Sequence, residues 1–221
     1  MIPKRLHRIW IGPYRMPAEY VANGQAWANF GWSVLDWSLD QLRQVPVSDE
    51  TRAVLDEIEA KGANPGGGLV NVAKWVQLAD VWSYELLREF GGVYANCDIE
   101  PLRDLPTDGL SAFVVAEDGH FLSNALMGGE AGHPFWRAVS EGLPQRFWSN
   151  RWGEMNTTTG PHHLTHIWNS AGFGVPRLEP VPFFPVRFTE ERDRDADWRP
   201  PAEFFVDHHW GHRHPELLEE A

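Results

Sequence analysis

The segment from Lys74 to Leu105 places the strongest constraint on the fold, because a helix, a double-glycine turn and a strand follow one another without a gap. In its first half, apolar side chains recur at the spacing of one helix face. These residues are Trp75, Leu78, Trp82 and Leu86. Gly91-Gly92 then supplies the left-handed backbone conformation that ends many helices, so the helix is predicted to end at about Phe90.

The strand that follows is predicted over Val93–Ala95 and leads directly into polar residues. Because side chains alternate along a strand, Asn96, Asp98 and Glu100 are expected to lie on one face at its end. Two carboxylates and an amide at such a place can hold a divalent cation, which prefers oxygen ligands. If Glu100 instead faces solvent, Asp98 remains as the principal ligand.

The rest of the chain alternates helices and strands in a way that predicts an α/β domain with a largely parallel sheet. Strands are predicted within 2–12, 31–38, 112–117 and 123–127, and an amphipathic helix over 50–61. Ligands of such sheets bind beyond the carboxyl ends of the strands. The polar residues after Ala95 are therefore expected to lie at a binding site.

Composition limits the class of protein. A chain of 221 residues with 43% hydrophobic content can form one domain with a substantial core. The formal charge of -12 disfavours a long nucleic-acid partner. The only cysteine, Cys97, excludes an intrachain disulfide, and neither a secretory signal nor a transmembrane segment is recognised, so a cytoplasmic protein is expected.

The run from Ala79 to Asp98 resembles the nucleotide-sugar-binding signature of GT-A fold glycosyltransferases. The group concerned contains outer-chain mannosyltransferases, capsular polysaccharide sugar transferases and glucosylating toxins. The positions that match the signature are Asp80, Leu87, Gly91, Gly92, Tyr94 and Asp98. At three positions the chain departs from it, since Ala79, Ser83 and Asn96 stand where the group has Ser, Arg and the first Asp of a DXD motif.

The resemblance implies a Rossmann-related, nucleotide-sugar-binding fold of the GT-A type, with a mostly parallel central sheet flanked by helices. It also implies a metal-dependent hexosyltransferase that moves a sugar from a UDP- or GDP-sugar to a hydroxyl acceptor with retention of configuration, using Mn²⁺ or Mg²⁺. In a single domain over 1–221, residues 1–105 would form the nucleotide-binding half and 106–221 the acceptor-side half. A glycan, a protein or another hydroxyl compound fits as acceptor, whereas the charge disfavours nucleic acid.

The resemblance assigns roles to residues in the first half of the chain. The opening IPKRLHRIWIG is similar to that of the same group and places Trp10 near the nucleotide base, although a core tryptophan is the alternative. Asp80 is expected to bind the ribose or the donor sugar, and its alternative is a buried ion pair with Arg88 or Lys74. Asp98 is the expected metal ligand, and Asn96 a weaker one because an amide carries no charge.

The second half supplies the remaining candidates. Asn124 lies in a segment similar to the one that lines the donor-sugar and acceptor cleft, and Thr159-Gly160-Pro161 matches a T-G-P element of the group. In the C-terminal FFVDHHW, His208 or His209 is the candidate third metal ligand. Arg213 is expected to bind the diphosphate in place of the G-S-W ending that the chain lacks.

Two other classes of function remain open. Asn96 and Ser83 are compatible with a nucleotide-sugar-binding protein whose turnover is weak or lost. The twelve tryptophans are compatible with a carbohydrate-binding protein that uses no nucleotide, because flat aromatic rings stack on sugars as well as fill cores.

Overall fold

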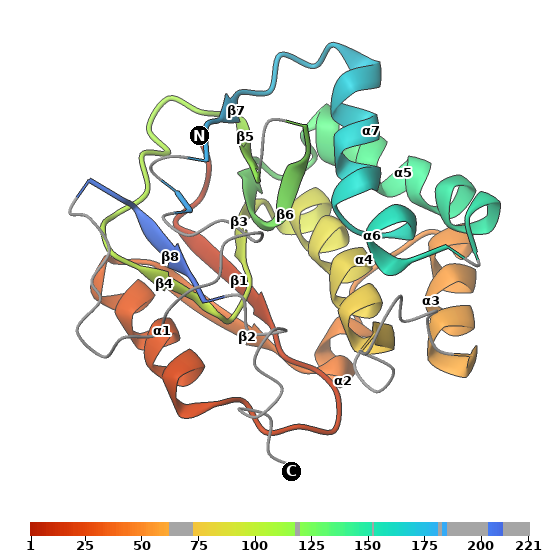
Figure 1. The fold of residues 1–221 in the computed structure, drawn as a ribbon, viewed down its shortest axis with the longest axis horizontal. Coiled ribbons are helices and arrows are strands. Elements are labelled where there is room, and N and C mark those ends of the chain that lie inside the picture. Colours follow the sequence, from red (N-terminus) through yellow and green to blue (C-terminus); the bar gives the residue numbers. More distant parts are fainter. Residues whose placement is uncertain (62–72, 118–119, 152, 181–182, 185–202, 210–221) are drawn as a thin grey trace.

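The computed structural model describes residues 1–61, 73–117, 120–151, 153–180, 183–184 and 203–209. Within them, a six-stranded sheet separates two groups of elements (Figure 1). In spatial order its strands are β2 (Ser33–Trp37), β1 (Arg5–Ile9), β3 (Gly92–Ala95), β6 (Leu122–Gly129), β5 (Ala112–Ala116) and β7 (Arg177–Leu178). The helices are α1 (Ala18–Asn29), α2 (Leu39–Leu42), α3 (Asp49–Lys61), α4 (Ala73–Phe90), α5 (Pro134–Ser149), α6 (Met155–Thr158) and α7 (Pro161–Ala171).

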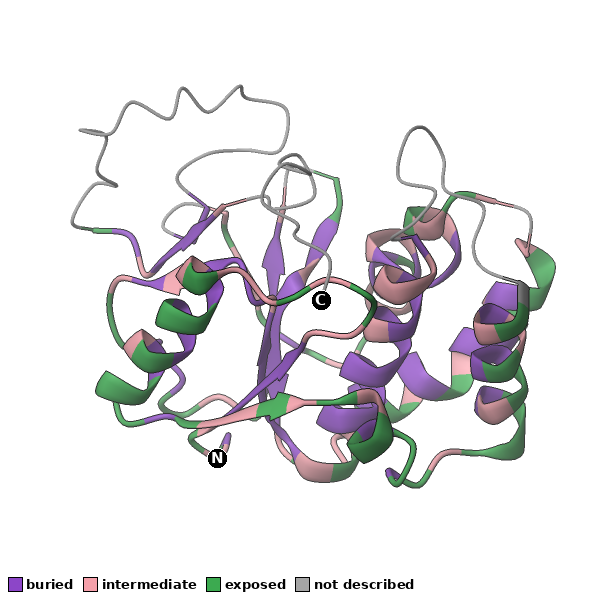
Figure 2. Ribbon diagram, turned by 90° about the horizontal axis from the view of Figure 1, so that it is seen from below, coloured by how far each residue is buried: buried purple, intermediate pink, exposed green. Residues whose placement is uncertain are grey.

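Both faces of the sheet are buried, and the alternation of side chains along each strand explains how. Ile9 and Tyr94 join the apolar cluster formed with α3, α4, α5 and α7. Leu6 and Val93, on the same two strands, join a second cluster with Trp27 of α1. Figure 2 shows the resulting layers, with buried residues running through the sheet between helices on either side.

The predicted α/β class with a mostly parallel sheet is confirmed. Strand β1 pairs in parallel with both β2 and β3, and β5 pairs in parallel with β7. Strand β6 is antiparallel to β3 and to β5. Only residues 117–121 separate β5 from β6, which is too short a connection for a parallel crossover.

The helix predicted to end at Phe90 is α4, and the double glycine ends it as expected. Gly91 has φ 59° and Gly92 has φ 105°, a region that side chains rarely adopt. A Cβ atom on Gly92 would lie 2.5 Å from the carbonyl oxygen of Arg5. Gly92 therefore allows β3 to pair closely with β1.

One prediction for the following segment is wrong: Asn96, Asp98 and Glu100 do not continue β3 as one strand. The chain turns after Ala95, where the N–H of Ile99 donates to the carbonyl oxygen of Asn96. Strand β4 (Ile99–Pro101) then pairs antiparallel with β8 (Val206–His208) in a separate two-stranded ribbon on the α1 side of the sheet (Figure 1). This turn changes which residues each of the three polar side chains contacts.

None of the helices in the described residues combines the length and the apolar content that crossing a membrane requires.

Candidate functional site

The centre of the site is Asp80, a carboxylate in the buried interior of α4. Both of its oxygens accept hydrogen bonds, Oδ1 from Nδ2 of Asn124 at 2.7 Å and Oδ2 from Oγ1 of Thr159 at 2.8 Å. Asn124 lies on β6, and Thr159 precedes α7. The alternative partner Arg88 instead lies with its Nε 2.8 Å from Glu85. Asp80 thus joins three elements that are distant in sequence.

The environment of Asp80 places its titration near neutral pH. Burial raises the pKa of this carboxyl to about 7, and the hydrogen bonds from Thr159 and Asn124 oppose the rise because they favour the charged form. Near neutral pH the group therefore populates both a carboxylate, which only accepts hydrogen bonds, and a carboxylic acid, which also donates one.

Side chains of α4 also hold the backbone that carries Thr159. The hydroxyl of Tyr84 donates to the carbonyl oxygen of Thr159 at 3.0 Å, and Nε2 of Gln77 donates to Oγ1 of Thr158 at 2.6 Å. The T-G-P element pointed to Thr159 in the sequence, whereas Tyr84 and Gln77 resembled ordinary helix residues. The hydrogen bonds of Tyr84 and Gln77 depend on the packing of α4 against the loop before α7, which the sequence alone does not reveal.

Ser83, which stands where the resembling group has Arg, is fully buried within α4. Its hydroxyl donates to the backbone carbonyl of Asp80 at 2.7 Å. This is a local helix contact. Ser83 therefore brings no positive charge to the Asp80 carboxylate.

Tyr94 contacts the turn after β3. Its hydroxyl donates to Oδ1 of Asn96 at 3.0 Å. Burial raises the pKa of the Tyr94 phenol well above its usual value, and Cys97, Asp80 and Asp98 raise it further. The phenol is therefore protonated at neutral pH, and its electrostatic environment includes both carboxylates.

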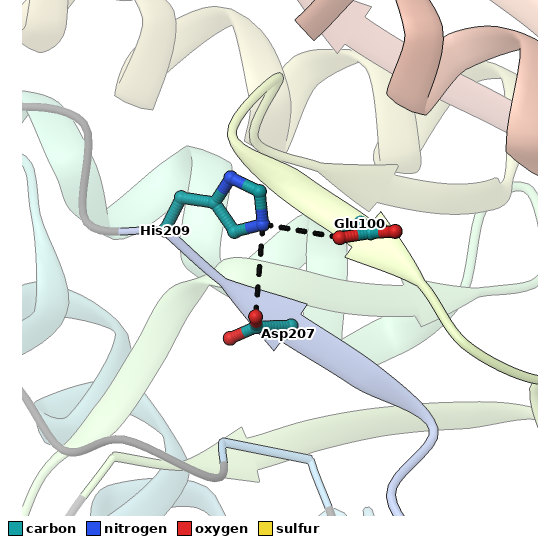
Figure 3. Close-up of side chains that lie close together, drawn as sticks. All are labelled: Glu100, Asp207 and His209. Carbon is teal, nitrogen blue, oxygen red and sulfur yellow. Dashed lines mark hydrogen bonds and ion pairs between the residues drawn. The ribbon is translucent and has the colours of Figure 1, made fainter. Parts of the chain in front are cut away.

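Asp98 and His208 meet where β4 and β8 come together. Oδ2 of Asp98 lies 3.3 Å from Nε2 of His208, and both residues are buried. The backbone N–H of His209 donates to the carbonyl oxygen of Asp98 at 3.0 Å, but its imidazole is directed elsewhere. As Figure 3 shows, that ring faces Glu100 and Asp207. The structure thus separates the two candidate histidines.

Trp10 lies just beyond β1, half-buried. Its Nε1 donates to the carbonyl oxygen of Tyr14, and its ring meets that of Tyr20 edge-on at 5.7 Å. The side chain is therefore fixed but not fully enclosed, and its stacking on a base remains a prediction. Arg213 lies outside the described residues.

His7 has a structural role. Its Nε2 donates to the carbonyl oxygen of Gly91 at 2.8 Å, and its Nδ1 accepts from Nε1 of Trp37 at 3.1 Å. These two bonds require the neutral imidazole, and burial lowers the pKa of His7 to about 4. His133 caps α5, since its Nδ1 accepts a hydrogen bond from the backbone N–H of Phe135.

Comparisons with known proteins find similar sequences and similar solved structures, while no protein-family model matches the chain. Over 98 residues the chain is 32% identical to inositol phosphoceramide mannosyltransferase 3 of Schizosaccharomyces pombe (strain 972). That alignment covers 43% of this chain and 28% of the relative. The chain thus matches less than a third of the length of this distant homologue.

In structure, the chain is similar to the PaToxG glycosyltransferase, with a TM-score of 0.61 at 14% identity over 78% of this chain and 70% of the other. It is also similar to the ligand-free glycosyltransferase domain of the YGT toxin. There the TM-score is 0.50 at 10% identity, over 80% of this chain and 79% of the other. At such low identities the likeness establishes the fold alone.

Proposed function

Starting from a chain that has the glycosyltransferase fold of toxin domains and distant homology to a mannosyltransferase, we propose that it transfers a sugar from a nucleotide-sugar donor to a hydroxyl acceptor. One observation carries the proposal: the fold brings Asn124 and Thr159, from two segments that resemble the donor cleft of that group, to the two oxygens of the buried Asp80 carboxylate. The nucleotide would bind mainly to residues 1–105 and the acceptor to the remainder.

The residues around Asp98 fit the divalent cation that the fold implies. A carboxylate oxygen and an imidazole nitrogen 3.3 Å apart are suitable ligands for Mn²⁺ or Mg²⁺, imidazole favouring Mn²⁺. Oδ1 of Asn96 accepts one hydrogen bond and keeps a second lone pair as a weaker ligand. We therefore assign Asp98 and His208 as ligands, with Asn96 beside them. A cation bound there would stabilise negative charge on the diphosphate leaving group.

The other side chains have binding roles in this proposal. The Asp80 carboxylate accepts hydrogen bonds from hydroxyl groups of the ribose or donor sugar. Asn124 orients that carboxylate and lines the cleft for the donor sugar and acceptor. Trp10 stacks on the base, and Arg213 binds the diphosphate. In the transfer, the acceptor oxygen bonds to the anomeric carbon as the bond to the phosphate oxygen breaks. The departing oxygen takes the acceptor's proton, so a retaining reaction of this kind needs no protein nucleophile.

The test measures nucleoside diphosphate released from a panel of UDP- and GDP-sugars with Mn²⁺. A mannose donor and an inositol phosphoceramide acceptor come first, because the relative's name mentions both. Asp98→Asn is expected to lower release at least about 100-fold, the scale of losing a charge-stabilising group. Asp108→Asn, at an exposed position, is the matched control. If no donor or free nucleotide raises the melting temperature, the proposal is wrong.

A second candidate is a protein that binds nucleotide sugars without turning them over. It is favoured by Ser83, whose hydroxyl is engaged within α4 where the resembling group has a cationic side chain. Donor binding by calorimetry, without any release of UDP or GDP over hours, would select this candidate. Release that depends on Asp98 would exclude it.

A further inference from the structure

One face of the β4–β8 ribbon brings together three metal-ligating side chains. Glu100 and Asp207 are directly opposite each other in the antiparallel register. Because side chains alternate, Asp207 and His209 share a face, whereas Val206 and His208 occupy the other. Val206 packs in the apolar cluster beneath the ribbon. Figure 3 shows the imidazole of His209 directed at both carboxylates.

The spacing of the three side chains suits the ligands of one cation. Nε2 of His209 lies 3.3 Å from Oε2 of Glu100, a distance that also permits a hydrogen bond, and 3.7 Å from Oδ2 of Asp207. Ligand atoms at about 2.1 Å from a tetrahedral ion lie about 3.4 Å from one another, which is close to both observed distances. All three ligand atoms fall within 4.8 Å of one another.

The chemistry of the three side chains points to a transition-metal ion. Asp207 is 1% exposed, which places one of the carboxylates in the interior. The imidazole adds a nitrogen ligand that Zn²⁺ and related transition metals favour over Mg²⁺ and Ca²⁺. Two carboxylates and one imidazole leave a coordination position for water.

We propose that Glu100, Asp207 and His209 form a binding site for a Zn²⁺-like divalent cation, separate from the Asp98–His208 pair. The ion would link β4 to β8, two strands more than 100 residues apart in the sequence. Since His208 is the neighbour of both Asp207 and His209, this link would also fix the strand that carries His208 to Asp98. The site does not depend on whether the protein transfers sugar.

The experiment measures Zn²⁺ binding to the full chain by competition with a chromogenic chelator, without nucleotide. The comparison is made in Asp98→Asn, which disables the Asp98–His208 pair as a second cation site. This variant is expected to bind one Zn²⁺ at least about tenfold more tightly than the double variant Asp98→Asn/Glu100→Gln, the usual scale for a lost ligand contact. Glu100 is half-exposed, so its amide variant is expected to fold. Zn²⁺ should also raise the melting temperature of Asp98→Asn and not that of the double variant.

Two results would overturn the site. One is equal Zn²⁺ affinity in Asp98→Asn and Asp98→Asn/Glu100→Gln, which would place any ion elsewhere. The other is no Zn²⁺ binding to Asp98→Asn, which would mean that the three side chains hold no ion. Both readouts are independent of turnover, so an inactive protein that binds Zn²⁺ through Glu100 would contradict the proposed function and leave the cation site standing.

Discussion

The hydroxyl of Thr159 tunes the charge of Asp80, since it donates to one oxygen of a buried carboxylate whose pKa is about 7. Replacing it in Thr159→Val removes a bond that favours the ionised form. A hydrogen bond to a charged group contributes about 1.5–3 kcal/mol, so the pKa of Asp80 is expected to rise by about 1–2 units. If the donor binds to the Asp80 carboxylate, the pH below which donor affinity falls is expected to rise by the same amount. Calorimetry at a series of pH values measures this.

Thr159→Ser keeps the hydroxyl and serves as the matched control. The pH dependence of donor affinity in Thr159→Ser is expected to match that of the wild type. A profile that is unchanged in Thr159→Val, with only the overall affinity reduced, would mean that Thr159 supports the loop without acting on the charge of Asp80.

At this scale the sequence predicts some residues of the site and misses others. Asp80 was identifiable because aspartate is a poor residue for a helix interior and because it matches the signature. Tyr84 and Gln77 were not, since their partners Thr159 and Thr158 lie more than 70 residues away. Helical periodicity specifies which face is buried, but not which distant carbonyl or hydroxyl that face meets.

At the scale of elements, the junction of α4 and β3 depends on Gly92. In Gly92→Ala, the new methyl group would lie 2.5 Å from the carbonyl oxygen of Arg5, and the φ of 105° is itself unfavourable. The pairing of β3 with β1 must then shift. The unfolding free energy is expected to fall by more than about 3 kcal/mol, measured by urea denaturation.

Gly172, at the end of α7, is the matched control because its φ is also positive, 55°, but no atom lies within 4 Å of the place that a methyl group would occupy. Gly172→Ala is expected to lower the unfolding free energy by about 1 kcal/mol, because of backbone strain alone. Equal losses in the two variants would show that backbone conformation, and not the approach of β1, limits position 92.

The helices and strands were more predictable than their pairing. Periodicity and glycines gave α4, β1, β2, β3 and β5 to within a few residues. The ribbon was missed, because the alternation of Asn96, Asp98 and Glu100 fits a continuing strand as well as it fits a turn followed by a new strand. The difference is decided by β8, whose sequence position gives no sign of its partner. As a consequence, Glu100 faces Asp207 rather than joining Asp98.

At the scale of the whole molecule, three buried groups make stability depend on pH in acid. Burial lowers the pKa of His7 and of His163 from 6.5 to about 4, so between about pH 4 and 6.5 the unfolded chain binds two protons that the folded chain does not. Each histidine therefore stabilises the fold above pH 6.5 and loses about 3 kcal/mol of that contribution as the pH falls to about 4. Asp80 acts in the opposite direction, because the folded chain protonates it below pH 7 while the unfolded chain protonates it only near 3.8.

The variant Asp80→Asn separates these effects, since it keeps both histidines and removes the opposing carboxyl. Between pH 8 and pH 4, its unfolding free energy is expected to fall more than that of the wild type, by about 4 kcal/mol. Urea denaturation at a series of pH values measures this difference. Parallel pH curves for the two proteins would mean that Asp80 titrates near its ordinary value in the folded chain.

The position of β8 has a consequence for synthesis on the ribosome. The strand that brings His208 to Asp98 is made more than 100 residues after the strand it joins. While residues 206–208 are still inside the exit tunnel, the nascent chain can form the central sheet and enclose Asp80, yet it lacks one wall of the Asp98 site. The contact of His208 with Asp98, in a protein built this way, forms only after most of the core has been made.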